Sequence, residues 1–319
     1  MYRSPDGRIL AANMETEGLY LFDPKLNLVQ NLKGSKSGFN DFSWYPWMQS
    51  SFPNSDCLLS VSKHVPVQLW DCSTGLVRCT WSPKDHLDQL ATCLSVTFSP
   101  DGQKVLAGSK DSIFVFDANR PSSTSSFTIS TVESRRDKHG LKGIISCLHC
   151  RNDASGLLAA GSFSGGLGIY HMNEKSHIAK LDAFRQGVTQ VQFGVTPWQL
   201  LAAGRHSNLI LEFDLRMLHE HVRSFDLGSE GHRGSQRIYF DIDFTSKCIV
   251  TGIGPRLAFF SLDSGLQLAS RNDDDMIINS VSVFNDRIAF STGTRQFIDK
   301  DTVPLPPQPS ICIIPASHS

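Results

Sequence analysis

Residues 94–117, LSVTFSPDGQKVLAGSKDSIFVFD, contain the unit that decides the fold of this chain. Two apolar runs flank the turn Ser99-Pro100-Asp101-Gly102, in which Pro and Gly stand where a tight turn requires them. A turn of small and polar residues then leads into a third apolar run, which closes with Phe116 and Asp117. This order predicts three antiparallel strands joined by short turns.

The aromatic residue at the end of the third run recurs along the chain. We assign this position to seven residues: Phe22, Trp70, Phe116, Tyr170, Phe213, Phe260 and Phe297. Successive members lie about 37 to 54 residues apart, which is the period of four-stranded propeller blades and not of helical repeats. Asp follows four of them, as it does at the end of the third strand of a WD repeat. We expect these aromatic side chains to fill the spaces between neighbouring blades.

The repeats predict an all-β fold, a seven-bladed WD-repeat β-propeller that forms a single domain over residues 1–319. The expected blades lie roughly at 1–32, 39–81, 92–129, 143–181, 187–225, 236–269 and 279–314. Only Met1 to Arg3 precede the first turn, so we expect the N-terminal blade to be truncated at its first strand, with no upstream segment to close the ring. In the last blade we expect strands at 279–284, 287–291 and 295–298, and an outer strand at 311–314.

Composition and charge exclude several classes of protein. The net charge is −1, so a nucleic-acid site must be a local patch and not a globally basic surface. No apolar run reaches the length of about 18 residues that a membrane-spanning helix needs. The N-terminal segment carries Arg3, Asp6, Arg8, Glu15 and Glu17 where a signal peptide would be apolar. We therefore expect a soluble intracellular protein that does not bind membranes.

No group of residues indicates catalysis, a cofactor or a metal ion. The lone C-x-x-C motif, Cys147 and Cys150, would place its two sulfurs on opposite faces of a strand. Asp241 and Asp243 share a strand face, yet no His and no metal-ligand spacing accompanies them. We expect no catalytic residues, no metal and no cofactor, and we expect that the chain is not an enzyme.

Several strings that a propeller does not require resemble the telomerase Cajal body protein family. Units two to six carry most of the resemblance, including Phe39-Asn40-Asp41-Phe42-Ser43-Trp44-Tyr45 and Gln236-Arg237-Ile238-Tyr239-Phe240-Asp241-Ile242-Asp243. The resemblance implies a nuclear WD-repeat protein that binds a short box in the terminal loop of small Cajal-body RNAs of the H/ACA class, and in animals of telomerase RNA. It further implies that the protein directs these RNAs to Cajal bodies, that the cytosolic chaperonin folds it, and that some of it is cytoplasmic.

Two departures from the family limit what carries over. The long disordered N-terminal region of the family is absent from this chain, and a Pro-rich tail stands in place of the family's acidic one. Functions of those two arms, including contacts with some protein partners, are therefore not implied.

A candidate RNA site follows from the turns between the second and third strands, which open on one face of the ring. Five of six such turns carry a basic residue and one carries an aromatic residue: Lys63, Lys110, Phe163, Arg205, Arg256 and Arg295. Connections into the first strands add further basic residues to this face: Lys142, Arg185, Arg237 and, from the long loop, Arg135 and Arg136. Single-stranded RNA loops require cations for phosphate and a platform for stacking. A solvated turn residue explains any one of these positions, but their recurrence favours a shared site.

A second class of function stays open. Phe213-Asp214-Leu215-Arg216 is similar to the WD-x-R box of substrate adaptors of cullin-type ubiquitin ligases. Arg216 could instead pair with Asp214 or with a neighbouring blade. The sequence favours an RNA-binding assembly factor and keeps a protein-interaction scaffold as the alternative.

Overall fold

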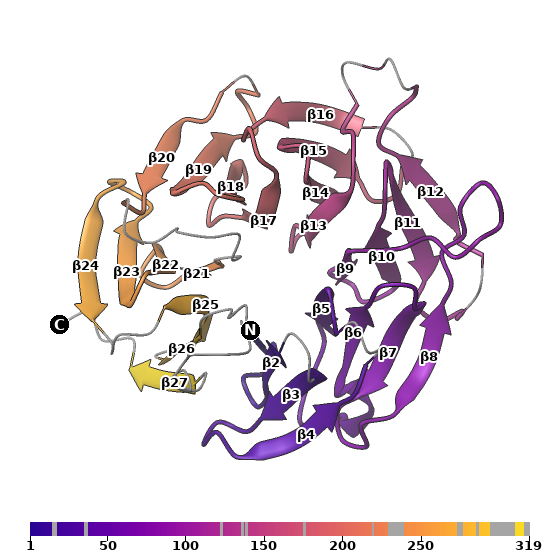
Figure 1. Cartoon of the computed structure of the whole chain (residues 1–319), viewed down its shortest axis with the longest axis horizontal. Helices are drawn as coiled ribbons and strands as arrows, with labels where there is room; N and C mark the ends of the chain where they lie inside the picture. Colours follow the sequence, from indigo (N-terminus) through magenta and orange to yellow (C-terminus); the bar gives the residue numbers. More distant parts are fainter. Residues whose placement is uncertain are drawn as a thin grey trace, which may run out of the picture.

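The computed structural model describes residues 1–14, 18–34, 38–121, 124–134, 137, 140–174, 177–218, 220–228, 239–272, 277–284, 287–293 and 310–315. These residues form seven antiparallel sheets that stand in a ring around a central channel (Figure 1). The prediction of an all-β, seven-bladed propeller is confirmed. The first strand of the first blade has two residues, as the short N-terminal segment predicted.

Blades 1 to 3 are four-stranded meanders in which consecutive strands pair. Blade 1 contains β1 (Tyr2–Arg3), β2 (Leu10–Met14), β3 (Gly18–Phe22) and β4 (Leu28–Leu32). Blade 2 contains β5 (Asp41–Trp44), β6 (Cys57–Val61), β7 (Val67–Asp71) and β8 (Val77–Trp81), with a short 3-10 helix, η1 (Pro53–Ser55), between β5 and β6. Blade 3 contains β9 (Ser95–Phe98), β10 (Lys104–Gly108), β11 (Ser112–Asp117) and β12 (Phe127–Ser130).

Blades 4 to 6 repeat the same order. Blade 4 contains β13 (Ile145–Cys150), β14 (Leu157–Ser162), β15 (Gly166–His171) and β16 (His177–Asp182). Blade 5 contains β17 (Val188–Phe193), β18 (Gln199–Gly204), β19 (Leu209–Asp214) and β20 (Arg223–Asp226). Blade 6 contains β21 (Phe240–Asp243), β22 (Cys248–Ile253), β23 (Arg256–Ser261) and β24 (Gln267–Asn272). In each blade the first strand lies nearest the channel and the fourth lies at the outside of the ring (Figure 1).

The aromatic positions of the repeat occupy one register in blades 1 to 6. Each aromatic residue lies opposite an aliphatic residue of the second strand, as Trp70 lies opposite Leu58 and Phe213 opposite Leu200. Trp70, Phe116, Tyr170, Phe213 and Phe260 are buried, and Phe22 is half-buried. Trp70 packs with residues of blade 1, so its side chain fills space between two neighbouring blades.

Blade 7 differs from the sequence prediction in the order of its strands. It contains β25 (Ile278–Phe284), β26 (Arg287–Thr292) and β27 (Ser310–Pro315), paired in that order. The prediction that 295–298 forms the third strand and 311–314 the outer one is wrong, because β25 and β27 occupy the two edges of β26. Ile314 lies opposite Ile288, in the register that aromatic residues hold elsewhere. Phe297, predicted for that place, lies outside the described residues.

The seven first strands are joined around the channel by hydrogen bonds between side chains and backbone. The links run in order through Val96 N to Asp41 Oδ2 (2.9 Å), Ser95 Oγ to Ile145 O (3.0 Å), Ser146 Oγ to Val188 O (2.6 Å), Gln190 Nε2 to Phe240 O (2.7 Å), Val283 N to Asp241 Oδ2 (2.8 Å), Arg3 N to Ser282 Oγ (3.1 Å) and Trp44 Nε1 to Tyr2 O (3.1 Å). Polar side chains of the channel wall thus form hydrogen bonds with backbone N–H and C=O groups of the neighbouring blade.

Candidate nucleic-acid interface

The two faces of the ring carry different connections. Because every blade is a meander, the turns between second and third strands lie at the same end as the connections into first strands. We call this end the basic face. The opposite face carries the turns between first and second strands and between third and fourth strands.

Three of the predicted basic residues begin the same kind of turn. Lys63, Lys110 and Arg205 are exposed, and each precedes a residue in the left-handed conformation. The φ angles of those next residues are 60° at His64, 55° at Asp111 and 51° at His206. Non-glycine residues adopt this conformation rarely, so its recurrence shows that the three turns share one backbone path. The path leaves the preceding basic side chain exposed on the basic face.

The connection into blade 4 is attached to the turn that contains Lys110. A backbone bridge joins Lys110 to Ile144, and Gly143 N donates to Asp111 Oδ1 at 2.6 Å. On its other side, the carbonyl oxygen of Lys142 accepts a hydrogen bond from Ser162 Oγ. Lys142 is thereby held between the turns of blades 3 and 4.

The same pattern continues from blade 4 to blade 5. Phe163 N donates to Ile144 O at 3.0 Å within blade 4. Phe184 N, in the connection into blade 5, donates to Gly165 O in the turn of blade 4 at 2.9 Å, and Arg205 N donates to Gly187 O at 2.8 Å. Arg185 lies in the short connection that ends at Gly187, and its side chain is exposed. These bonds bring residues from three blades into one continuous basic strip: Lys110, Lys142, Phe163, Arg185 and Arg205.

The remaining predicted site residues lie elsewhere or outside the described residues. Lys63 belongs to blade 2 on the same face, and Arg256 is the half-buried first residue of β23 in blade 6. Neither is joined to the strip by the bonds above. Four other predicted residues lie outside the described part of the chain: Arg135, Arg136, Arg237 and Arg295.

Three glycines lie in the turns and connections that form the strip, and they were not among the residues predicted for the site. Gly143 and Gly187 both precede a first strand and both have positive φ angles, of 92° and 73°. Gly165 has a φ of 97°, and a Cβ atom there would lie 1.8 Å from Phe184 O. The recurrence of Gly one or two residues before a first strand was the signal that could have identified them.

Ion pairing distinguishes four predicted site residues from several cations of the opposite face. Three cations of the opposite face have carboxylate partners: Arg78 with Asp71 (2.7 Å), Arg216 with Asp214 (2.6 Å) and Lys247 with Asp263 (3.9 Å). Within the described part of the chain, Lys63, Lys110, Arg185 and Arg205 form no ion pair. Their charges are therefore available to an anion such as phosphate.

The other motifs of the sequence have local roles. The Arg216 guanidinium pairs with Asp214 and lies 4.2 Å from the centroid of the Trp198 ring, so its own blade explains its position. Cys147 packs with the core between blades 4 and 5, whereas Cys150 packs with the core between blades 3 and 4. The described residues contain no group of three His, Cys, Asp or Glu side chains that could hold a metal ion. Nor do they contain a helix long and apolar enough to cross a membrane.

Comparison with known proteins places the chain among two groups of relatives. No family model matches it. The human telomerase Cajal body protein 1 is 32% identical over 214 residues, which cover 66% of this chain and 37% of the human protein. The Drosophila melanogaster homolog of that protein is 25% identical over 273 residues, or 79% of this chain and 48% of the fly protein.

A fission yeast protein is similar over a comparable length. Guanine nucleotide-binding protein negative regulator 1 of Schizosaccharomyces pombe is 27% identical over 269 residues, which cover 78% of this chain and 66% of the yeast protein. The chain spans less than half the length of the Cajal body relatives that it matches. The resemblance read from the sequence strings is confirmed, and the chain is a homologue of the telomerase Cajal body proteins over the segment that they share.

Proposed function

We propose that this propeller binds the localisation box of small Cajal-body H/ACA RNAs through the basic strip and directs these RNAs to Cajal bodies for ribonucleoprotein assembly. The observation that carries the proposal is the strip itself, in which exposed basic residues from three blades share neighbouring turns and connections with Phe163. The names of the human and fly relatives, which refer to telomerase and the Cajal body, support the same assignment.

The chemistry of the strip suits an unpaired RNA loop. Lysine and arginine side chains attract phosphate without regard to sequence, and an aromatic ring provides a platform on which an unstacked base can lie. The net charge of the chain is −1, so the strip does not merely reflect a globally basic protein. A loop that displays its bases fits this surface better than a regular duplex, whose bases are stacked inside.

The proposal extends to location and partners. RNA delivery to Cajal bodies requires a nuclear protein, with a cytoplasmic fraction during synthesis and folding by the cytosolic chaperonin. Telomerase RNA is a client in those organisms whose telomerase RNA carries the box.

Salt-dependent binding measurements test the strip directly. A labelled hairpin RNA with the box in its loop is titrated with the wild type and with Lys110→Ala, Arg185→Ala and Arg205→Ala at several salt concentrations. Each lost phosphate contact should reduce the slope of log affinity against log salt by about 0.7 to 1. Phe163→Ala should instead weaken binding by about 1 to 3 kcal/mol with the slope retained.

Lys247→Ala provides the matched control. Its side chain is 53% exposed and lies on the opposite face, so it removes one charge without touching the strip. We expect its titration to match that of the wild type. Superimposable weak curves for the wild type and all strip variants would remove RNA binding from this face.

A protein-interaction scaffold is the second candidate. The fission yeast relative, named for negative regulation of a guanine nucleotide-binding protein, is matched over a larger share of its length than the Cajal body relatives. A substrate adaptor of a cullin-type ubiquitin ligase, suggested by the similarity of residues 213–216 to a WD-x-R box, is also a protein-interaction scaffold. Crosslinking in cells followed by sequencing of bound RNA supports the first function if box-containing RNAs are recovered. Recovery of G-protein or ligase subunits without such RNAs would support the second.

A further inference from the structure

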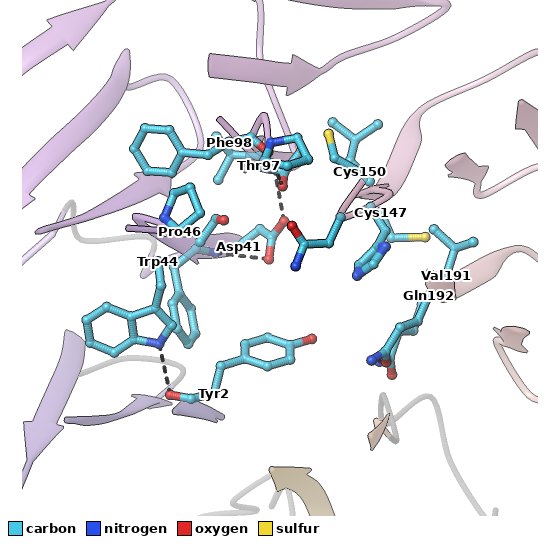
Figure 2. A pocket seen from close by; sticks show the side chains of 18 of the residues that line it. Tyr2, Asp41, Trp44, Pro46, Thr97, Phe98, Cys147, Cys150, Val191 and Gln192 are labelled. Carbon is cyan, nitrogen blue, oxygen red and sulfur yellow. Dashed lines mark hydrogen bonds between the residues drawn. The ribbon is translucent and has the colours of Figure 1, made fainter. Parts of the chain in front are cut away.

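Trp47 lies between two hollows of the ring. The first is a cavity of about 510 Å³ in the central channel, the channel cavity, where side chains from the first strands of blades 1 to 6 surround one open space (Figure 2). The second is a groove of about 530 Å³ between blades 2 and 3, the inter-blade groove. Trp47 and Phe98 line both, so these two side chains lie where the hollows meet. Neither hollow is lined by a residue of the basic strip.

The inter-blade groove is formed by connections of the opposite face. The connection between β5 and β6 lines it from blade 2, and the turns that contain Gly102 and Asn119 line it from blade 3. The buried ring of Trp81 also lines the groove, and its Nε1 donates to Asp117 O at 3.1 Å, from one blade to the next. The groove therefore lies along the junction of two directly bonded blades.

Two aromatic side chains of the groove are exposed on a backbone that hydrogen bonds fix. Phe52 is 63% exposed and Trp47 is 57% exposed. Phe52 N donates to Gln49 O at 3.0 Å, and Phe52 O accepts from Ser55 N at 2.8 Å and from Ser55 Oγ at 2.6 Å. Exposed aromatic groups on such a backbone are typical of surfaces that contact another protein chain, because little ordering is needed when the partner binds.

The Tyr45 ring makes the wall between the two blades rigid. Its centroid lies 5.4 Å from that of Phe98, in an edge contact. On the blade 3 side, a Cβ atom at Gly102 would lie 2.7 Å from the Tyr45 ring, so the ring packs directly on the backbone of that turn. The groove is thus preformed by packed rings.

The groove offers no free charge. Among the described residues that line it, Arg78 alone is charged. Its Nε and Nη2 donate to Asp71 Oδ2 at 3.0 and 2.7 Å, and its Nη1 donates to Asn54 O at 2.5 Å. A guanidinium that is already paired gives little advantage to a phosphate or to a charged peptide.

The polar groups that remain available are side-chain amides. Gln49 and Asn119 are both exposed, and they line the groove from blade 2 and from blade 3. Within the part of the chain that the structure describes, neither side-chain amide forms a hydrogen bond. Each can therefore donate to a backbone carbonyl that has no partner of its own.

We infer that the inter-blade groove is a docking site for an uncharged, proline-rich segment of a partner protein in the polyproline II conformation. Proline rings pack on aromatic side chains such as Trp47 and Phe52. Polyproline II has no internal hydrogen bonds, so its carbonyl oxygens can accept from Gln49 and Asn119. A helix would leave both amides unused, because its carbonyls are bonded internally. Since the basic strip lies on the other face, the segment and an RNA can bind together.

A second copy of this chain fits the groove less well than a different protein does. The chain has its own proline-rich run at 304–309, which leads into β27 at Ser310. Ser310 pairs with Thr292, at the basic-face end of blade 7, whereas the groove opens on the opposite face. Two copies would have to stack head to tail to bring that run to the groove.

Binding of defined peptides tests the inference. Fluorescein-labelled Gly-Pro-Pro-Leu-Pro-Pro-Gly, with its C-terminus blocked, is titrated with the protein and compared with the peptide in which alanine replaces every proline. We expect saturable binding of the proline peptide and at least tenfold weaker binding of the alanine peptide. Absence of saturable binding, or equal binding of the two peptides, would overturn the inference.

Variants locate the site. Trp47→Ala and Phe52→Ala should each weaken binding of the proline peptide at least fivefold. Phe244→Ala, 57% exposed in a turn of the same face but outside both hollows, should not change it, nor should Asn152→Ala, which alters the channel cavity alone. Melting curves establish that all four variants are folded. If Asn152→Ala weakens binding and Phe52→Ala does not, the peptide occupies the channel cavity and the inference is overturned.

Sedimentation velocity over a range of protein concentrations distinguishes a partner protein from a second copy. We expect no self-association through the groove. Self-association that the proline peptide reverses and Phe52→Ala abolishes would assign the groove to a second copy of the chain and overturn its assignment to a partner protein.

Discussion

His149 is expected to make the stability of this protein fall in acid. It lies on β13, partly buried in the wall of the channel cavity, with its ring 5.7 Å from that of Phe193. Nδ1 accepts a hydrogen bond from Phe193 N at 3.4 Å, which assigns the proton of the neutral ring to Nε2. Removal from water disfavours the charged ring and lowers the pKa of His149 from 6.5 to about 4.

The size and sign of the loss of stability follow from the difference between the pKa of His149 in the folded protein and in the unfolded chain. The folded-state pKa lies below the unfolded one, so between pH 6.5 and 4 the unfolded chain binds more protons than the folded protein. The contribution of neutral His149 is therefore complete above about pH 6.5 and is lost as the pH falls toward 4. A shift of about 2.5 units corresponds to a total loss of about 3 kcal/mol, of which about 2 kcal/mol is lost by pH 5.

Urea unfolding followed by tryptophan fluorescence measures this loss at a series of pH values from 7.5 to 4.5. His149→Gln is the reference variant, because its amide oxygen can accept the Phe193 N–H without titrating. Groups such as Asp241 contribute equally to both proteins, so the difference between the two free energies of unfolding isolates His149. Parallel pH curves for wild type and variant would show that His149 titrates normally in the folded protein and would refute the reasoning.

Two further substitutions test the packing. Trp70→Ala should reduce the free energy of unfolding by roughly 3 to 5 kcal/mol, since it removes a buried ring and the 2.8 Å hydrogen bond from Nε1 to Ser60 Oγ; an unchanged melting temperature would contradict its place between blades. Gly165→Ala should destabilise by more than Gly228→Ala, because both positions have positive φ but only the first would press a Cβ against the Phe184 carbonyl. Equal decreases in melting temperature for the two variants would show that the backbone around Gly165 moves to accept the Cβ atom.

The repeat itself could be predicted from the sequence because its signals are local. Turns such as Ser99-Pro100-Asp101-Gly102 join strands adjacent in the chain, and β9 and β10 pair on either side of it. Pro and Gly restrict the backbone of such turns whatever surrounds them. The register that places Trp70 and Phe213 opposite aliphatic residues follows from the same short connections. The relationship to the telomerase Cajal body proteins could also be recognised from the sequence, because it rests on short continuous strings such as residues 236–243.

The order of strands in blade 7 was decided by tertiary packing. The segments 295–298, Arg-Gln-Phe-Ile, and 311–314, Ile-Cys-Ile-Ile, are both short, and the repeat pattern favoured the first of them as the partner of β26. Ile314 packs with Val250 and Ile288, whereas Ile311 and Ile313 face residues of blade 1. Both faces of this apolar strand are thus partly covered by neighbouring blades, which depends on neighbours far away in the sequence.

Assembly of the surface sites likewise required the folded ring. Sequence periodicity assigned Lys110 and Arg205 to equivalent turns, but backbone bonds at Gly143, Gly165 and Gly187 place them in one strip with Lys142. The cavity had no sequence signal, because Tyr2, Asp41 and Gln192 come from three blades and meet only when the ring closes. Local turn chemistry determines each blade, whereas contacts between blades determine which side chains share a surface.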